Sequence, residues 1–303
     1  MILVLLAAAV VAISYVCFRM AFYISDKEKR ENAARSLPPG EEYAPYHNTM
    51  QCWQDEVKTF PCEEFSIASF DGLTLKGRYY ERFPGAPIEL MFHGYRGNAM
   101  RDLCGGVQRC FACGRNALLV DQRASGESEG NVITFGIRER KDCLAWVAFM
   151  RQHFGADVKI ILTGISMGAA SVLMAAGEDL PENVIGVLAD CGYTSAKDII
   201  CKVISQMKLP PRLAYPFVKL GARLFGGFDL EESAPVEAVK RAKVPVIFFH
   251  GQSDDFVPCD MSRQMYDACT TRKHLHTVPG AAHGLAFPAD EETYISVLRE
   301  FFP

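Results

Sequence analysis

Six short, strongly apolar runs recur along the sequence and alternate with segments of helical pattern. Such runs of four to six residues are typical of strands that are buried on both faces of a parallel sheet. Because helices connect these strands, the alternation predicts the α/β fold class. The runs lie at residues 88–92, 117–120, 158–162, 184–189, 244–249 and 274–278.

An antiparallel hairpin is expected before these runs. Residues 65–70 and 73–80 follow a period-two pattern around Asp71-Gly72, and an Asp-Gly pair between two such segments is a strong hairpin signal. The chain has 303 residues, 49% of them apolar, which is enough for one full-sized core. We therefore predict one α/β domain at 62–303, with a mostly parallel central sheet, an N-terminal hairpin and helices on both faces.

The N-terminal segment is apolar and uncharged over its first 18 residues, close to the ~20 residues that span a bilayer. Arg19 follows, and its side chain can extend to the headgroups. A cleavable signal peptide is the main alternative, but the basic start and small-residue cleavage site that it requires are not properly placed. A core helix of a soluble domain is rarely so long and so free of charge. We predict a transmembrane anchor at 1–24.

Charge predicts the orientation of this anchor. The domain after a single span tends to stay in the cytoplasm when the basic residues follow the span. Here no basic residue precedes it, and those that follow are Arg19, Lys27, Lys29, Arg30 and Arg35. The 11 cysteines are an odd number spread through apolar segments, and we expect free thiols in a reducing compartment.

One group of cysteines is compact in sequence, namely Cys104, Cys110 and Cys113. Such a group can hold a metal or a redox pair. The amphipathic helix expected over 100–114 has no histidine nearby, so we predict no metal site. A net charge of −4 and scattered basic residues give no basic face, which excludes nucleic acid as an expected partner. The sequence predicts no oligomeric state.

Two segments do not follow the alternation of strands and helices. Residues 25–61 mix charged residues, prolines and aromatic residues, which is typical of a linker with a peripheral helix. Residues 196–242 are helical in pattern and contain Pro210, Pro211 and Pro216. We interpret this long connection as a small helical lid over the carboxyl edge of the sheet. An ordinary pair of crossover helices is the alternative.

The pentapeptide Gly164-Ile165-Ser166-Met167-Gly168 follows the third apolar run and opens a segment rich in small residues. A Gly-x-Ser-x-Gly sequence between a strand and a helix is typical of a nucleophile elbow. Its glycines allow a strained turn, and the first amides of the helix can face an oxyanion. Ser166 is therefore the candidate nucleophile.

A serine nucleophile needs a base and an acid that orients the base. The loop after the fifth apolar run contains Asp254 and Asp255. We favour Asp254 as the acid, with Asp255 as the alternative. His283 follows the last run among small residues and is the candidate base. We interpret His93 and His250, both at strand ends, as structural.

A glycine-rich turn, His93-Gly-Tyr-Arg-Gly-Asn98, follows the first apolar run. Acyl transfer needs backbone donors that face the developing oxyanion, and this strand end can supply one of them. We predict that the donors are the backbone amides of Tyr95 and Met167.

Five ordered motifs together resemble the α/β-hydrolase family over residues 66–302. The closest likeness is to membrane-anchored bacterial hydrolases related to the serine aminopeptidase and prolyl oligopeptidase-like catalytic domains. The motifs are the turn at 93–98, the segment 121–130, the elbow, His250-Gly-x-x-Asp254-x-x-Val-Pro258 and Gly280-x-x-His283. The resemblance implies the α/β-hydrolase fold with a helical lid, and Asp254 as the acid of the triad.

The segment 121–130 departs from the family's Asp-x-Arg-Gly-His-Gly pattern at Ala124 and Ser125. That segment normally shapes the sheet edge, so the departure bears on substrate fit and not on the triad. A serine nucleophile also argues against an enzyme of the dienelactone hydrolase type.

These residues imply an acyl hydrolase that acts on a small-molecule acyl substrate without a metal or organic cofactor. We expect a carboxylic ester first, because esters need the least help with the leaving group, and short peptides are the alternative. An acyltransferase would use the same triad. A non-catalytic binding protein on this fold usually lacks one triad member.

Overall fold

The computed structural model describes residues 1–302, except for the side chain of Cys104. Pro303 and the side chain of Cys104, one member of the compact cysteine group, thus lie outside the described part of the chain. Cys110 is buried and Cys113 half-buried, both as free thiols. The expectation that this group binds no metal stays a prediction.

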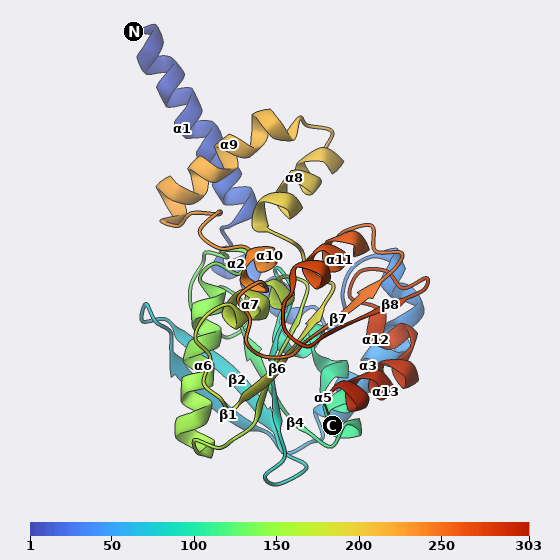
Figure 1. The fold of residues 1–303 in the computed structure, drawn as a ribbon. Helices are drawn as coiled ribbons and strands as arrows, with labels where there is room; N and C mark the ends of the chain where they lie inside the picture. The colour runs from blue at the N-terminus through green and yellow to red at the C-terminus, as the bar shows by residue number, and fades with distance from the viewer. Residues whose placement is uncertain (303) are drawn as a thin grey trace.

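A mixed eight-stranded sheet forms the centre of the molecule (Figure 1). The strand order is β1-β2-β4-β3-β5-β6-β7-β8, in which β1–β2 and β2–β4 are antiparallel and all other neighbours are parallel. This confirms the predicted mostly parallel sheet with an N-terminal hairpin. The strands are Glu63–Ala68 (β1), Thr74–Tyr80 (β2), Ile88–Phe92 (β3), Asn116–Asp121 (β4), Ile160–Ile165 (β5), Val184–Asp190 (β6), Val246–Gly251 (β7) and Lys273–Val278 (β8).

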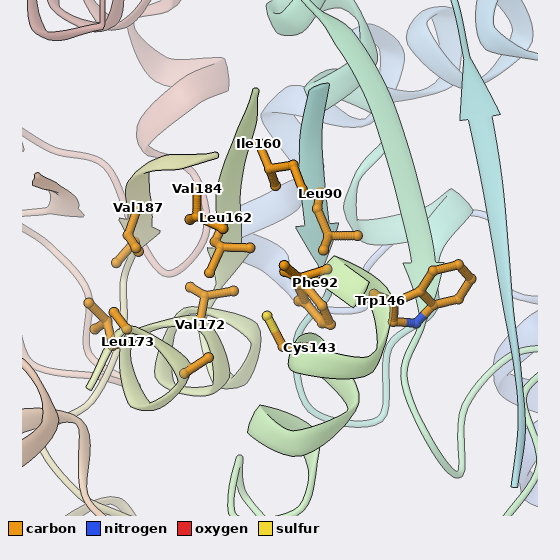
Figure 2. Close-up of a cluster of buried hydrophobic side chains, with 14 of the residues drawn as sticks. Leu90, Phe92, Cys143, Trp146, Ile160, Leu162, Val172, Leu173, Val184 and Val187 are labelled. Carbon is orange, nitrogen blue, oxygen red and sulfur yellow. The ribbon is translucent and has the colours of Figure 1, made fainter. Parts of the chain in front are cut away.

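Helices cover both faces of the sheet, which explains why the inner strands β3, β4 and β7 are buried along their whole length. The hairpin strands β1 and β2 instead alternate in burial, and the expectation that the run 274–278 is buried on both faces is wrong, because only Val278 is buried in the edge strand β8. Along β3, Leu90 and Phe92 pack in the cluster on one face, while Met91 packs in a cluster on the other. Figure 2 shows Cys143 and Trp146 of α6 beside Leu90 and Phe92. The covering helices are α3 (His47–Val57), α5 (Cys104–Ala112), α6 (Glu139–Phe154), α7 (Met167–Ala176), α11 (Cys259–Ala268), α12 (Ala286–Ala289) and α13 (Glu291–Phe301).

The prediction of a single helix over 100–114 is wrong. The chain forms two helices there, α4 (Ala99–Asp102) and α5. Gly105 and Gly106 are poor helix formers, but they let α5 approach its neighbours closely. A Cβ atom at either glycine would lie within 2.8 Å of a side chain on α3 or β3. Close packing against α3 and β3 therefore determines the helical structure of this region more than the amphipathic pattern does.

The apolar helix α1 (Ile2–Ala21) begins far from the domain and ends inside it (Figure 1). Its length and composition are sufficient to cross a membrane. Its later turns are not free, since Ser14 and Phe18 are buried. Phe22 and Ile24, which follow the helix, are buried in a cluster that includes the first residue of α7. The end of the predicted anchor is thus part of the domain core.

The remaining helices lie in the linker and in the segment 196–242. Ser25 and Glu28 form a capping box at the start of α2. In the second segment, α8 and α9 stand away from the sheet, and α9 crosses α1 (Figure 1). The helices are α2 (Asp26–Ala34), the 3₁₀ helix η1 (Glu41–Tyr46), α8 (Ala196–Gln206), α9 (Pro211–Gly221), the π-helical turn η2 (Ala222–Gly226) and α10 (Pro235–Ala238).

A buried ion cluster links β3 to α5, to the turn before β4 and to β5. The carboxylate of Glu89 accepts hydrogen bonds from Arg109 and Arg115, at 2.8 Å each, and from the Thr163 hydroxyl at 3.0 Å. Burial alone would raise the pKa of Glu89, but the two guanidinium groups outweigh it and lower the pKa to about 2. The cluster is therefore ionised at neutral pH.

Replacing Glu89 with alanine is expected to lower the free energy of unfolding by about 3–5 kcal/mol, because two buried guanidinium groups lose their counter-ion. Urea unfolding followed by circular dichroism measures the change. Asp179→Ala is the matched control, since its ion pair with Lys243 is exposed and should contribute less than about 1 kcal/mol. Equal effects of the two substitutions would contradict a structural role for the cluster.

Candidate active site

The turn between β5 and α7 holds Ser166 in a strained conformation, with φ 55° and ψ −116°. Non-glycine residues rarely adopt such a positive φ unless the surrounding structure requires it. A Cβ atom on Gly164 would lie 2.2 Å from the Gly168 backbone, and one on Gly168 would lie 2.0 Å from the carbonyl oxygen of Phe92. The two glycines are thus needed for close backbone contact, and the turn presents Ser166 at the carboxyl edge of the sheet.

Three of the predicted site residues form one chain of hydrogen bonds. The Ser166 hydroxyl lies 2.9 Å from His283 Nε2, and His283 Nδ1 lies 2.7 Å from Asp254 Oδ2. Asp254 is buried, whereas Asp255 is exposed and its carbonyl accepts a hydrogen bond from Lys202. The geometry therefore favours Asp254 over the alternative Asp255.

His250 contributes more than the structural role that its sequence position suggested. Its imidazole is fully buried, and Nε2 lies 2.8 Å from the Val257 carbonyl and 3.2 Å from Asp254 Oδ2. Both neighbours of Nε2 are acceptors, so Nε2 carries the proton and Nδ1 accepts from the Ser262 hydroxyl at 2.7 Å. His250 therefore helps to fix the carboxylate that faces His283.

The carboxyl group of Asp254 is held in its ionised form. Burial would raise its pKa, but hydrogen bonds from His250 and His283 outweigh burial and lower the pKa to about 2. The backbone amides of Phe256 and Val257 also donate to Oδ1, at 2.9 and 2.7 Å. Asp254 is thus an anion that orients His283 throughout the neutral range.

Stability is expected to fall in acid because Asp254 and Glu89 both have lower pKa values in the folded chain, about 2, than in an unfolded chain, about 4. Groups of this kind stabilise the fold above their unfolded pKa, and this contribution disappears as the pH falls through the folded value. The melting temperature should therefore drop between about pH 5 and pH 2. The Asp254→Asn variant should show a shallower drop, measured by differential scanning fluorimetry. An identical slope would contradict the assignment.

The turn after β3 brings Tyr95 next to Ser166 in the lining of one cavity, and Met167 directly follows the serine. The loop is held in place by α1, because the Tyr95 hydroxyl donates to the Ala21 carbonyl at 2.8 Å. Arg96 also donates to the carbonyl oxygen of Tyr23 at 3.0 Å. The predicted oxyanion donors are therefore on elements that converge on Ser166, one of them tied to the N-terminal helix.

A cavity of about 700 Å³ opens beside Ser166 and His283. Much of its wall comes from the linker, including Glu28, Tyr43 and Trp53. In the described part of the chain, residues 1–302, no residue of the segment 196–242 lines this cavity. The lid role of that segment stays a prediction, and the linker is the nearer cover of the site.

Sequence reasoning missed Asp190, a buried acidic residue in the lining of this cavity. Asp190, at the end of β6, accepts a hydrogen bond from the Tyr294 hydroxyl at 2.9 Å, while its second oxygen is buried with no hydrogen-bond partner among the described residues. Burial raises the pKa of Asp190. Its position at the end of an apolar strand could have indicated this role, because polar residues at the carboxyl ends of parallel strands gather at one edge of the sheet.

Cys191, Asp254 and His283 offer ligand atoms within 4.8 Å of one another, which is close enough for a metal site. Asp254 and His283 already bond to each other. Burial raises the pKa of the Cys191 thiol well above its usual range, which leaves a protonated and weak ligand. Asp254 and His283 therefore fit the hydrogen-bonded chain to Ser166 better than a metal centre.

Residues 134–302 match the sequence profile of the prolyl oligopeptidase family, and this range includes Ser166, Asp254 and His283. The chain belongs to the prolyl oligopeptidase family. Membership confirms the resemblance to α/β-hydrolases that the five motifs carried and makes the chain an enzyme of the hydrolase type.

This prolyl oligopeptidase family member is similar in sequence to the uncharacterized protein YqkD of Bacillus subtilis (strain 168). The two are 24% identical over 297 residues, which cover 98% of this chain and 94% of that protein. In structure it is similar to the Pyrococcus furiosus esterase Pf2001, with a TM-score of 0.65 and 20% identity over 81% of this chain and 93% of the esterase. It also resembles the Pyrococcus horikoshii acylaminoacyl peptidase, with a TM-score of 0.60 and 18% identity over 88% of this chain and 44% of the peptidase. These likenesses show the fold.

Proposed function

We propose that this protein is a serine hydrolase that cleaves a carboxylic ester through an acyl-enzyme intermediate. The observation that carries the proposal is the hydrogen-bonded chain from Ser166 through His283 to Asp254, with distances of 2.9 and 2.7 Å. In this arrangement His283 Nε2 takes the hydroxyl proton as Ser166 Oγ attacks the carbonyl carbon. Asp254 stabilises the resulting imidazolium and holds its orientation.

The remaining steps of the proposal use His283 and the predicted oxyanion donors. The amides of Tyr95 and Met167 donate to the oxyanion of the tetrahedral intermediate. His283 then returns its proton to the leaving alcohol. A water molecule, deprotonated by His283, then attacks the acyl carbon; the bond from this carbon to Ser166 Oγ breaks, His283 returns the proton to Oγ, and the acid is released.

Short peptides are the second candidate substrate. Glu31 and Glu42 line the cavity, and their carboxylates could pair with a free amino terminus. The acylaminoacyl peptidase likeness points in the same direction. An acyltransferase would require a bound alcohol in place of the hydrolytic water.

Parallel assays with ester and anilide substrates distinguish these candidates. A fluorophosphonate probe should label the purified chain, and p-nitrophenyl esters of increasing acyl length should be hydrolysed with a length optimum that the cavity sets. Aminoacyl p-nitroanilides in parallel test the peptidase. Turnover of anilides but not esters would overturn the ester proposal, and faster ester consumption with added alcohols would indicate transfer.

His250→Asn tests the positioning role of His250. We expect kcat to fall by up to about 100-fold with little change in KM, because small displacements of catalytic groups have effects of this size. Ser262→Ala is the matched control, since it removes only the hydroxyl bonded to His250 Nδ1 and should cost less. Steady-state kinetics across pH measures both variants. A change in KM alone would contradict the assignment.

We propose further that α1 remains attached and anchors the domain to a membrane from the cytoplasmic side. Cleavage after α1 would remove Phe18, and cleavage after the predicted anchor at residue 24 would also remove Phe22; both side chains are buried in the domain, so retention is required for the observed core. The basic residues after α1 support the orientation. A reporter fused after Pro303 should be active in the cytoplasm, and activity only outside would overturn this topology.

A further inference from the structure

The segment that crosses α1 has an unusual composition for the surface of a soluble domain. Residues 199–228 contain five basic residues and no acidic residue. Lys219 and Arg223 pair with acidic residues that follow this range, whereas Lys208 and Arg212 are exposed. Large apolar side chains are exposed beside them: Met207, Leu209, Leu213, Leu224 and Phe225.

This segment packs directly on α1. A Cβ atom on Gly221 of α9 would lie 2.3 Å from the Ser14 carbonyl oxygen, which shows that the two backbones are in close contact. The Phe225 ring of η2 lies 5.1 Å from Tyr15 and 5.9 Å from Phe18. Small residues at such a crossing are typical of helices that pack within membranes.

The length of α1 fixes where this crossing lies relative to a bilayer. The part before Ser14 is exposed and extends about 20 Å at 1.5 Å per residue. The hydrocarbon core of a bilayer is about 30 Å thick. A span by α1 therefore needs its later turns as well, and these are the turns that α9 and η2 contact.

We propose that α9, η2 and the turn at 207–210 lie in the interfacial layer of the bilayer that α1 enters, with Lys208 and Arg212 facing anionic lipid headgroups. The exposed apolar side chains would then enter the acyl region, as in helices that lie in the membrane interface. Basic residues at this depth are attracted to anionic lipids. The segment thus joins α1 in a single lipid-facing surface, and the proposal does not depend on the substrate.

Depth-dependent fluorescence quenching tests this placement in the full-length chain. Leu213→Trp is reconstituted in vesicles of phosphatidylcholine and phosphatidylglycerol, with and without brominated acyl chains. The emission of the parent chain, which contains Trp53 and Trp146, is subtracted. We expect a blue shift and loss of most of the added emission with brominated lipid, and a smaller blue shift in vesicles of phosphatidylcholine alone.

Two further variants make every outcome decisive. Ala156→Trp, in the exposed turn before β5, should stay unquenched, and Leu5→Trp reports insertion of α1. Quenching at Leu5 without quenching at Leu213 overturns the proposal, as does the absence of quenching at both. A blue shift at Leu213 that brominated lipid does not quench would indicate contact with a second protein surface instead, and also overturns it.

Discussion

Replacing Ser166 with alanine is expected to lower kcat by at least about 10⁴-fold, because the proposed triad would act as a unit and lose its nucleophile. Labelling by a fluorophosphonate probe should disappear in the same variant. The substitution removes one oxygen and leaves the backbone of the elbow as it is, so the thermal unfolding midpoint should change little. Initial rates with the best p-nitrophenyl ester and gel fluorescence of the probe measure the two effects.

Ser171→Ala is the matched control for this experiment. Ser171, like Ser166, is a buried serine, but it lies within α7 and its hydroxyl donates to the Met167 carbonyl at 2.9 Å, whereas the hydrogen bond of His283 Nε2 is to Ser166. The control should label normally. Full activity or labelling in the Ser166→Ala chain would remove the proposed function, and a second nucleophile would then have to be sought.

Removing residues 1–24 is expected to prevent stable folding, whereas removing residues 1–12 is not. The longer deletion takes away Phe18, Phe22 and Ile24, which are at most 5% exposed. Loss of a buried aromatic or aliphatic side chain costs about 2–5 kcal/mol. Three such losses together approach the total stability of a typical domain, about 5–15 kcal/mol.

The same deletion also removes the Ala21 carbonyl that accepts the Tyr95 hydroxyl, so the turn after β3 loses its support. Purification in detergent, circular dichroism melting and probe labelling compare the two truncated chains with the full chain. We expect the chain that starts at residue 13 to melt cooperatively and to label. Cooperative melting of the chain that starts at residue 25 would contradict the assignment of these residues to the core.

The strands and the elbow were predictable because their causes are local. Burial on both faces requires a continuous apolar run such as Ile88–Phe92, and close backbone contact requires glycine at positions such as Gly168. The order of the motifs then brought Ser166, Asp254 and His283 to one edge of the sheet.

Features that depend on distant contacts could not be read from the sequence. An apolar run does not distinguish burial in lipid from burial in protein, so the burial of Phe18 and Phe22 was not expected. The carbonyl of Ala21 and the hydroxyl of Tyr95 lie 74 residues apart, and no local pattern links them. His250 did carry a local signal, because it precedes Asp254 by four residues, but its contact with the carboxylate depends on the fold of the loop.

The residues proposed for catalysis and the residues that shape much of the cavity wall belong to different parts of the chain. Ser166 and His283 belong to the sheet edge, whereas Glu28, Tyr43 and Trp53 belong to a segment that contains no triad member. Under the proposed function, changes in the linker would therefore alter which acyl group fits while the proposed catalytic residues stay in place. Two relatives with the same triad would then differ in substrate through their first 60 or so residues, and exchanging that segment would carry the preference with it.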